Sequence, residues 1–262
     1  MDLDAIRRIE AADRERSRIR AKTWIKGIAI AAIVVIAGFW TIGLVVDAIV
    51  SSISEETEAE WFAGLDIGCT QPELEVGDDY ARAEAIFAKL VASGDLRPLP
   101  FRLCFVEMDV PNAFAVPGGA VGITGPLLAN VESEKGLAMV LAHELGHQQH
   151  RHSLKRIGRS LAIGLGLALL FGDNAGLASR VIDLASLSHS REQEREADRF
   201  GLELVQQTFG DTEGALEFFE FVARNDEEGS IWGSLLQTHP LTTERLEYLR
   251  EMQREIAAAP AK

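Results

Sequence analysis

Residues 133–151 read SEKGLAMVLAHELGHQQHR, and this stretch decides what the rest of the chain must be built around. A serine at its start suits a helix N-cap and the acidic residue after it suits the first turn, so we expect a helix over its length. His143 and His147 are four residues apart, which places both imidazoles on one helix face. With Glu144 beside the first histidine, this spacing predicts a Zn²⁺ site in which Glu144 acts as a base. Gly146 leaves room for the close approach of another backbone or of the groups that surround the metal ligands.

A zinc site that keeps one position open needs a third protein ligand, and residues 191–200, REQEREADRF, offer candidates. In a helix, Glu194 shares a face with the small and apolar residues that should meet the core. Glu192 and Glu196 fall on the opposite, solvated side. We therefore expect Glu194 to be the ligand. Asp198, one turn further along the same face, can accept the other N–H of a ligating histidine and fix its tautomer.

The two histidines that follow the pair are not expected to bind the metal. His150 lies about 10.5 Å from His143 along a helix axis, which is too far for one ion. His152 is expected to point elsewhere and to end the helix.

The remaining pattern predicts a mainly α fold with a small β-sheet (α+β). Residues 79–92 have the spacing of an amphipathic helix. Strand-like runs follow at 101–108, 113–116 and 119–124, separated by proline and glycine. After residue 126 the chain is mostly helical.

The segment 112–124 is expected to bind a polypeptide in extended conformation. Its glycines allow a second backbone to come close, and an exposed strand edge there would add the ligand as another strand. The residues assigned to this role are Asn112, Phe114, Gly118 and Gly119. A simple hairpin in the core is compatible with the same residues.

The composition excludes one large class of function. The 262 residues contain 40 Asp and Glu against 26 Lys and Arg, a formal net charge of −14. Nucleic-acid binding needs a cationic surface, so no nucleic-acid partner is expected. The charge is uneven, because residues 1–26 hold eight cations and five acids and the remainder carries −17.

A membrane segment separates these parts. Residues 27–46, GIAIAAIVVIAGFWTIGLVV, contain no charge, and a helix of that length spans about 30 Å, the thickness of the hydrocarbon core. By the positive-inside rule, residues 1–26 form a cytoplasmic basic segment and everything after the span is exported. Residues 47–78 are expected to form an acidic linker. A second apolar stretch, residues 161–171, is too short to span and is expected to be a buried helix or, alternatively, a shallow membrane contact.

The chain has two cysteines, Cys69 and Cys104, and both lie in the part expected to be exported. An oxidising compartment would make a disulfide between them plausible, and two buried free thiols are the alternative.

Four motifs in this order resemble the HtpX-like zinc endopeptidases, a family that also includes the CaaX prenyl endopeptidases and the BepA-like periplasmic proteases. They are Asn112-Ala113-Phe114-Ala115-x-Pro117-Gly118-Gly119, His143-Glu144-x-x-His147, Ser190-Arg191-x-x-Glu194-x-x-Ala197-Asp198, and Thr238-His239-Pro240 with Arg245. The resemblance covers about residues 79–251 and implies a gluzincin fold with two histidines and one glutamate on zinc. Members with several spanning helices enclose the site in the bilayer. This chain has one anchor, so prenyl-protein cleavage is not expected.

The resemblance also suggests roles for two residues near the C-terminus. His239 is the candidate donor to the oxyanion of the tetrahedral intermediate, together with Arg245. Alternatively, His239 occupies the open zinc position in a resting state.

These observations predict a zinc endopeptidase domain over residues 79–262, held by a single span in a bacterial inner membrane with the domain in the periplasm. Its expected role is cleavage of misfolded or unassembled proteins in envelope quality control. A chaperone-like scaffold that holds clients without cutting them is the alternative. Glu144 favours the enzyme, because a binding protein needs no base beside the first ligand.

Overall fold

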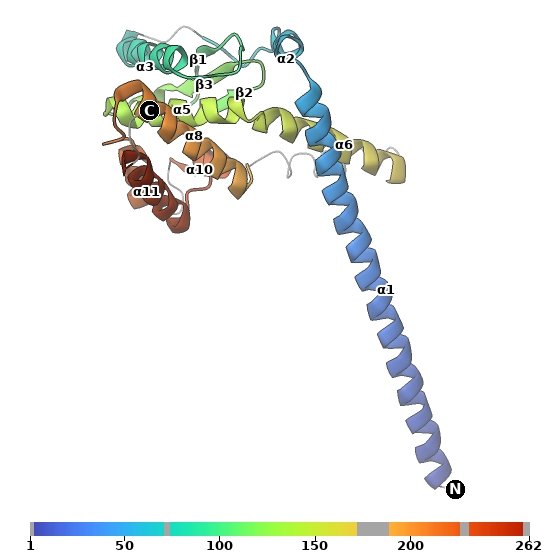
Figure 1. The fold of residues 1–262 in the computed structure, drawn as a ribbon. Coiled ribbons are helices and arrows are strands. Elements are labelled where there is room, and N and C mark those ends of the chain that lie inside the picture. Colours follow the sequence, from blue (N-terminus) through green and yellow to red (C-terminus); the bar gives the residue numbers. More distant parts are fainter. Residues whose placement is uncertain (1–2, 71–73, 172–188, 226–230, 259–262) are drawn as a thin grey trace. The chain divides into compact units, whose positions relative to one another are not determined.

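The computed structural model describes residues 3–70, 74–171, 189–225 and 231–258 and divides the chain into two compact units, Met1–Ala48 and Ile49–Lys262. The first unit is formed by helix α1, Leu3–Ser52, whose last turn belongs to the second unit (Figure 1). The span predicted at residues 27–46 lies within Arg20–Ser52, the part of the described chain that is long and apolar enough to cross a membrane. Most of its apolar side chains are exposed, as lipid-facing side chains would be, and Val46 and Val50 near its end are buried.

The second unit has a three-stranded sheet and a set of helices, which confirms the predicted α+β class. The sheet order is β1-β3-β2, with β1 parallel and β2 antiparallel to β3. The elements of this unit after α1 are α2 (Glu55–Phe62), α3 (Leu74–Ser93), β1 (Arg102–Val106), β2 (Ala113–Val116), β3 (Ala120–Thr124), α4 (Gly125–Leu128), α5 (Glu134–Gln149), α6 (His152–Phe171), α8 (Arg191–Phe209), α9 (Glu217–Asn225), α10 (Gly233–Thr238) and α11 (Thr243–Ala258).

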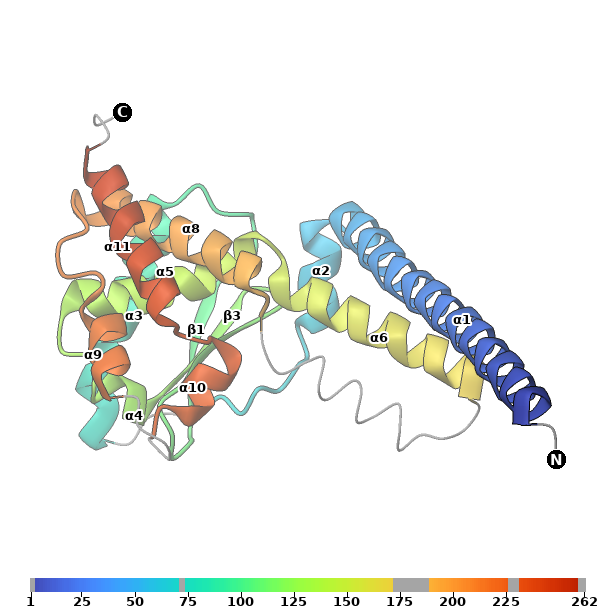
Figure 2. The same ribbon diagram turned by 90° about the horizontal axis from the view of Figure 1, so that it is seen from below.

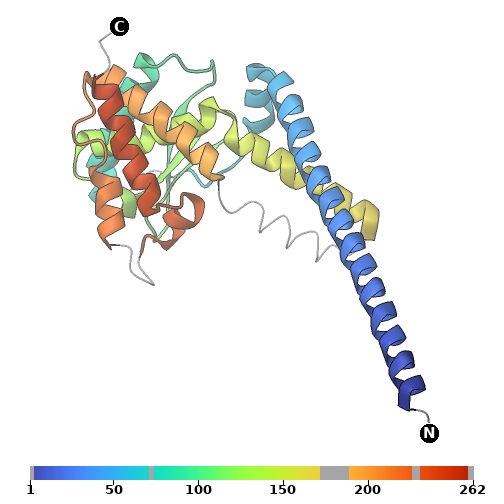
Figure 3. The same ribbon diagram turned by 60° about the horizontal axis from the view of Figure 1, so that its bottom comes forward.

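Helix α5 is the centre of this unit. Its residues from Gly136 to Gln148 are buried on every side, which explains why its sequence has no polar stripe. It packs against α3, α8 and β2, and α11 in turn packs against α8 (Figures 2 and 3). Ser133 caps the helix as predicted, because its hydroxyl accepts a hydrogen bond from the Gly136 N–H.

Helices α5 and α8 approach each other closely because a glycine faces the contact from each. A Cβ on Gly146 would lie 2.9 Å from the Cα of Ala197, and one on Gly201 would lie 3.2 Å from the backbone nitrogen of His143. Two small residues therefore allow near-contact between the two backbones. This contact brings the acidic face of α8 to the histidines of α5.

Part of the segment 47–78 is not the linker that we expected. Helix α2 lies within it, and Glu58 of that helix is 1% exposed. Its carboxylate lies 2.5 Å from Arg97 and 3.4 Å from Arg151. The acidic composition suggested solvation, but these two cations lie far away in the sequence and neutralise the carboxylate in the fold.

The buried-helix expectation for residues 161–171 is also wrong for the side chains that the structure describes. Leu161 and Leu165 of α6 are 66% and 64% exposed. The side chains of residues 167–171 lie outside the described part.

The two cysteines form a disulfide, as the sequence suggested. Cys69 and Cys104 are bonded across a separation of 35 residues. Cys69 also forms a β-bridge with Val106, so the segment after α2 is attached to strand β1.

Candidate metal centre

The two histidines of α5 converge as their spacing predicts. The Nε2 atoms of His143 and His147 are 3.0 Å apart, and the two side chains are almost completely buried. Burial holds the pKa of His147 well below its ordinary value, which keeps this imidazole neutral. A neutral imidazole is the form that binds a metal.

Helix α8 contributes Glu194. The helix begins with a capping box in which Ser190 and Gln193 bond each other's backbone N–H groups, and this box fixes its first turn. Glu194 Oε2 lies 3.5 Å from His143 Nε2, and Oε1 lies 3.4 Å from His147 Nε2. Burial raises the pKa of Glu194, but the neighbouring histidines outweigh burial and hold that pKa well below its usual range.

His239, directly after α10, completes the cluster. Its Nδ1 lies 3.3 Å from His143 Nε2 and 3.2 Å from Glu194 Oε1. Its Nε2 lies 3.4 Å from Glu144 Oε1. The other carboxylate oxygen of Glu144 is buried and makes no hydrogen bond.

The donor set fits a zinc ion. Ligand atoms of His143, His147, Glu194 and His239 all lie within 4.8 Å of one another. Zinc bonds of about 2.0–2.1 Å at a tetrahedral angle place neighbouring ligand atoms about 3.3 Å apart. The contacts between donors range from 3.0 Å to 3.5 Å. Buried imidazole and carboxylate groups that converge on one point are stabilised by a cation between them, and the donor types and their spacing are those of a zinc site.

Asp198 and Arg245 hold this arrangement from the α8 and α11 side. Asp198 Oδ1 lies 3.0 Å from His143 Nδ1, as the helical phase predicted. The guanidinium of Arg245 donates two hydrogen bonds to Asp198, at 2.7 Å and 2.8 Å, and pairs with Glu194 at 2.6 Å. Burial lowers the pKa of His143, but the carboxylates of Asp198 and Glu194 raise it to about 10. In this arrangement Arg245 positions the two carboxylates.

A second chain of contacts, through His152, was not expected. His152 is 1% exposed, and its Nδ1 lies 2.9 Å from His147 Nδ1. Its Nε2 donates to Glu196 at 2.9 Å. Burial lowers the pKa of His152 to about 3, so its ring is neutral. Because Nε2 donates to a carboxylate, Nδ1 of His152 must accept, His147 Nδ1 must donate, and the lone pair of His147 Nε2 faces the cluster.

The contacts of His152 correct the sequence-based predictions for two residues. His152 does not end the helix of His147: it begins α6, after Arg151, whose φ of 55° turns the chain. Glu196 lies on the solvated side of α8, yet it binds the far side of a buried histidine. Glu196 lies close to the metal centre because the turn at Arg151 brings His152 next to it. The helical phase of α8 alone does not predict this contact.

The segment expected to bind an extended polypeptide divides into two parts. Strand β2, with Phe114, is an edge of the sheet and packs beside α5, and Asn112 directly precedes it. Gly118 and Gly119, with φ of 86° and 98°, form the turn after β2. The Gly118 N–H donates to Glu58, and a Cβ on Gly119 would meet the carbonyl of Pro100, so the protein's own segments occupy the space beside both glycines. The edge strand nearest α5 is β2, and its Ala115 carbonyl already accepts a hydrogen bond from the Ser153 hydroxyl at 2.9 Å.

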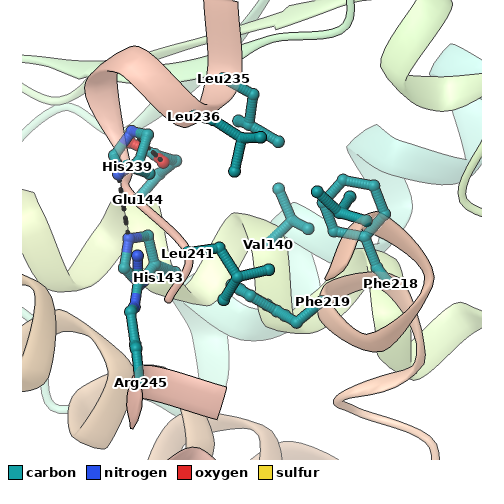
Figure 4. Close-up of a pocket in the computed structure, with 11 residues that line it drawn as sticks. Val140, His143, Glu144, Phe218, Phe219, Leu235, Leu236, His239, Leu241 and Arg245 are labelled. Atoms are coloured by element: carbon teal, nitrogen blue, oxygen red, sulfur yellow. Dashed lines mark hydrogen bonds and ion pairs between the residues drawn. The ribbon is translucent and has the colours of Figure 1, made fainter. Parts of the chain in front are cut away.

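An apolar pocket opens beside the cluster (Figure 4). His143, Glu144, His239 and Arg245 form its polar side. The rest is lined by apolar side chains from α5, α9, α10 and the following loop, namely Val140, Phe218, Phe219, Val222, Leu235, Leu236 and Leu241. A second cavity, of about 420 Å³, shares Glu194 and Arg245. The cluster is thus bordered by space on which a polypeptide could lie.

Residues 79–253 match peptidase family M48, and the chain belongs to that family. The peptidases of this family are zinc-dependent, and the chain has a buried cluster that could hold the metal and an apolar N-terminal helix suited to membrane association.

Three curated relatives show how far the similarity extends. The mitochondrial metalloendopeptidase OMA1 of Schizosaccharomyces pombe is 32% identical over 63% of this chain and 50% of its own length. The beta-barrel assembly-enhancing protease of Escherichia coli K12 is 28% identical over 79% of this chain and 48% of its own length. The metalloprotease YcaL of the same organism is 28% identical over 70% of this chain and 76% of its own length. The chain spans about half the length of the first two.

Proposed function

We propose that this protein is a membrane-anchored zinc endopeptidase that cleaves misfolded or unassembled proteins on the periplasmic side of a bacterial inner membrane. The observation that carries the proposal is the buried cluster of four zinc-type donors with Glu144 beside it. The disulfide supports an oxidising compartment, and the charge asymmetry around residues 27–46 supports export of the domain. The bacterial relative named as an enhancer of beta-barrel assembly supports a role in the envelope.

In this proposal His143, His147 and Glu194 hold the metal, and Glu144 is the base. Bound zinc would polarise the scissile carbonyl and make a nearby water more acidic. Glu144 accepts a proton from that water through its unpaired, buried carboxylate oxygen and delivers the proton to the departing amine. His239 reaches the same carboxylate and the same ligands, which allows it either to donate to the oxyanion or to occupy the fourth metal position at rest.

The substrate of this site is an extended, apolar segment of polypeptide. A substrate that displaces the Ser153 hydroxyl from the Ala115 carbonyl could pair with edge strand β2 beside α5 through main-chain hydrogen bonds, which do not depend on sequence. The apolar lining of the pocket beside Glu144 favours an apolar side chain next to the scissile bond. Segments of this kind are buried in folded proteins and exposed in misfolded ones, so the site selects its clients by their folding state.

The test compares metal content with turnover. Glu144→Gln should retain zinc and lose cleavage of casein by orders of magnitude, because the base is removed and the ligands remain. Glu194→Ala should lose both. Glu192→Ala, an exposed glutamate of the same helix turn, is the matched control and should keep both. Near-normal cleavage by a zinc-loaded Glu144→Gln protein would refute the proposed mechanism.

Topology is tested separately. A reporter that is active only outside the cytoplasm, fused after the last residue, should be active. If only a cytoplasmic reporter works at that position, the periplasmic assignment is wrong while the peptidase activity stands.

A further inference from the structure

Helix α6 presents an apolar face that the peptidase site does not use. Ile157, Leu161 and Leu165 are 38%, 66% and 64% exposed. Their spacing of four residues places them along one side of the helix. Large apolar side chains that recur on one exposed helix face indicate a surface that meets an apolar partner.

The beginning of α6 is tied to the end of the anchor helix. The guanidinium of Arg151, the residue before α6, donates a hydrogen bond to the carbonyl of Val50 in the last turn of α1. It also pairs with Glu55 at 3.1 Å and Glu58 at 3.4 Å, both in the helix that follows the anchor. All of these residues belong to the second unit. The helix therefore starts where the chain leaves the candidate span.

The charge of α6 suits the surface of an anionic bilayer. Its sequence, HSLKRIGRSLAIGLGLALLF, contains three cations and no acidic residue, whereas residues 27–262 together carry a formal charge of −17. One of the three cations, Arg156, contacts the buried His189 of the protein itself at 3.2 Å. Cations near one end and an apolar face along the helix are the composition of a helix that lies in a membrane interface.

We propose that α6 is a second membrane element, which lies in the interface of the bilayer that α1 crosses, with Leu161 and Leu165 in contact with acyl chains. At 1.5 Å per residue these two side chains lie about 15 Å and 21 Å along the chain from Arg151. The anchor keeps the helix at the membrane, at an effective concentration on the order of millimolar, so a short apolar face is sufficient. Contact at two points fixes the orientation of the peptidase domain on the bilayer.

Site-specific fluorescence tests this proposal on the full-length protein. The native cysteines are paired in a disulfide, so a cysteine introduced by Leu161→Cys can be labelled alone with an environment-sensitive dye. The protein is placed in vesicles of phosphatidylethanolamine and phosphatidylglycerol, with quenchers carried on the acyl chains. Leu44→Cys in the span is the positive control, and Glu203→Cys, an exposed position on α8, is the negative control.

The dye at position 161 should be quenched by the lipid-borne groups as strongly as the dye at position 44, and several-fold more than the dye at position 203. Aqueous iodide should give the opposite order. Strong iodide quenching at 161 without lipid quenching would overturn the proposal. Quenching that depends on the number of protein copies per vesicle would assign the face to a second copy of this chain and would also overturn it. Leu165→Cys repeats the measurement with Leu161 intact.

Discussion

Replacement of Gly146 by alanine tests the close contact between α5 and α8 on which the metal centre depends. In an open helix, alanine would be more stable than glycine by about 0.5–1 kcal/mol. Here the new Cβ would lie 2.9 Å from the Cα and 3.0 Å from the carbonyl oxygen of Ala197. Both are backbone atoms, so α8 itself must shift.

The magnitude follows from these two opposing effects. Overpacking of a close contact costs about 1–3 kcal/mol, which exceeds the propensity gain. We expect Gly146→Ala to lower the free energy of unfolding by about 1–2 kcal/mol. Glu194 lies one turn before Ala197 on the face of α8 that meets α5, so the same shift displaces the carboxylate from the histidines. Zinc affinity should therefore fall by about tenfold or more, the effect seen when groups that orient ligands are disturbed.

The assay is urea unfolding together with competition for zinc by a chelator. Gly77→Ala in α3 is the matched control, because no described atom beyond its chain neighbours and its own helix backbone lies within 4 Å of the new Cβ. This variant should be as stable as the natural protein or more stable, with unchanged zinc affinity. If Gly146→Ala behaves like Gly77→Ala in both measurements, the inferred contact does not position the metal ligands.

Three further predictions follow from the structure. His152→Ala and Glu196→Ala should each weaken zinc binding by about 10–100-fold in chelator competition, because the tautomer of His147 is no longer fixed. Unchanged zinc affinity in both variants would refute this series of hydrogen bonds. His239→Ala should change the rate of peptide cleavage by at least about tenfold while zinc is retained. A lower rate would indicate that His239 donates to the oxyanion, and a higher rate would indicate that it is a metal ligand in the resting state. Equal kinetics would exclude both roles. Reduction of the Cys69–Cys104 disulfide, which closes a 35-residue separation, should lower the free energy of unfolding by about 3–4 kcal/mol, and equal midpoints with and without reductant would contradict this.

The parts of the centre that could be predicted from sequence depend on periodicity within one helix. The spacing of His143 and His147 determines that they share a face, and the phase of α8 separates Glu194 from its neighbours. The close approach at Gly146 could be anticipated because a glycine in a helix has few other uses. In these cases the residues that determine the arrangement lie within a few turns of one helix.

The parts that could not be predicted depend on how one element turns relative to the next. His152 was assigned by extending the helix of His147, but the φ of 55° at Arg151 breaks that extension. An arginine with positive φ has no signature in the sequence, because this conformation is rare for residues with a Cβ. The burial of Glu58 was missed for a similar reason, since its partners Arg97 and Arg151 lie far along the chain.

Glu58 also shows how helix α2 is connected to the metal-binding helix. One carboxylate accepts a hydrogen bond from the turn after β2 at Gly118 and pairs with Arg97 and Arg151. Arg97 in turn donates to the carbonyl of Gln148, the residue after the second histidine of α5. Arg151 separates α5 from α6, the helix that we assign to the membrane interface. A single buried group, the Glu58 carboxylate, thus joins three parts of the fold. These are the end of the metal-binding helix α5, the turn after edge strand β2 and helix α2. Because a buried carboxylate that loses its cations is strongly destabilised, these three parts of the second unit must keep one arrangement.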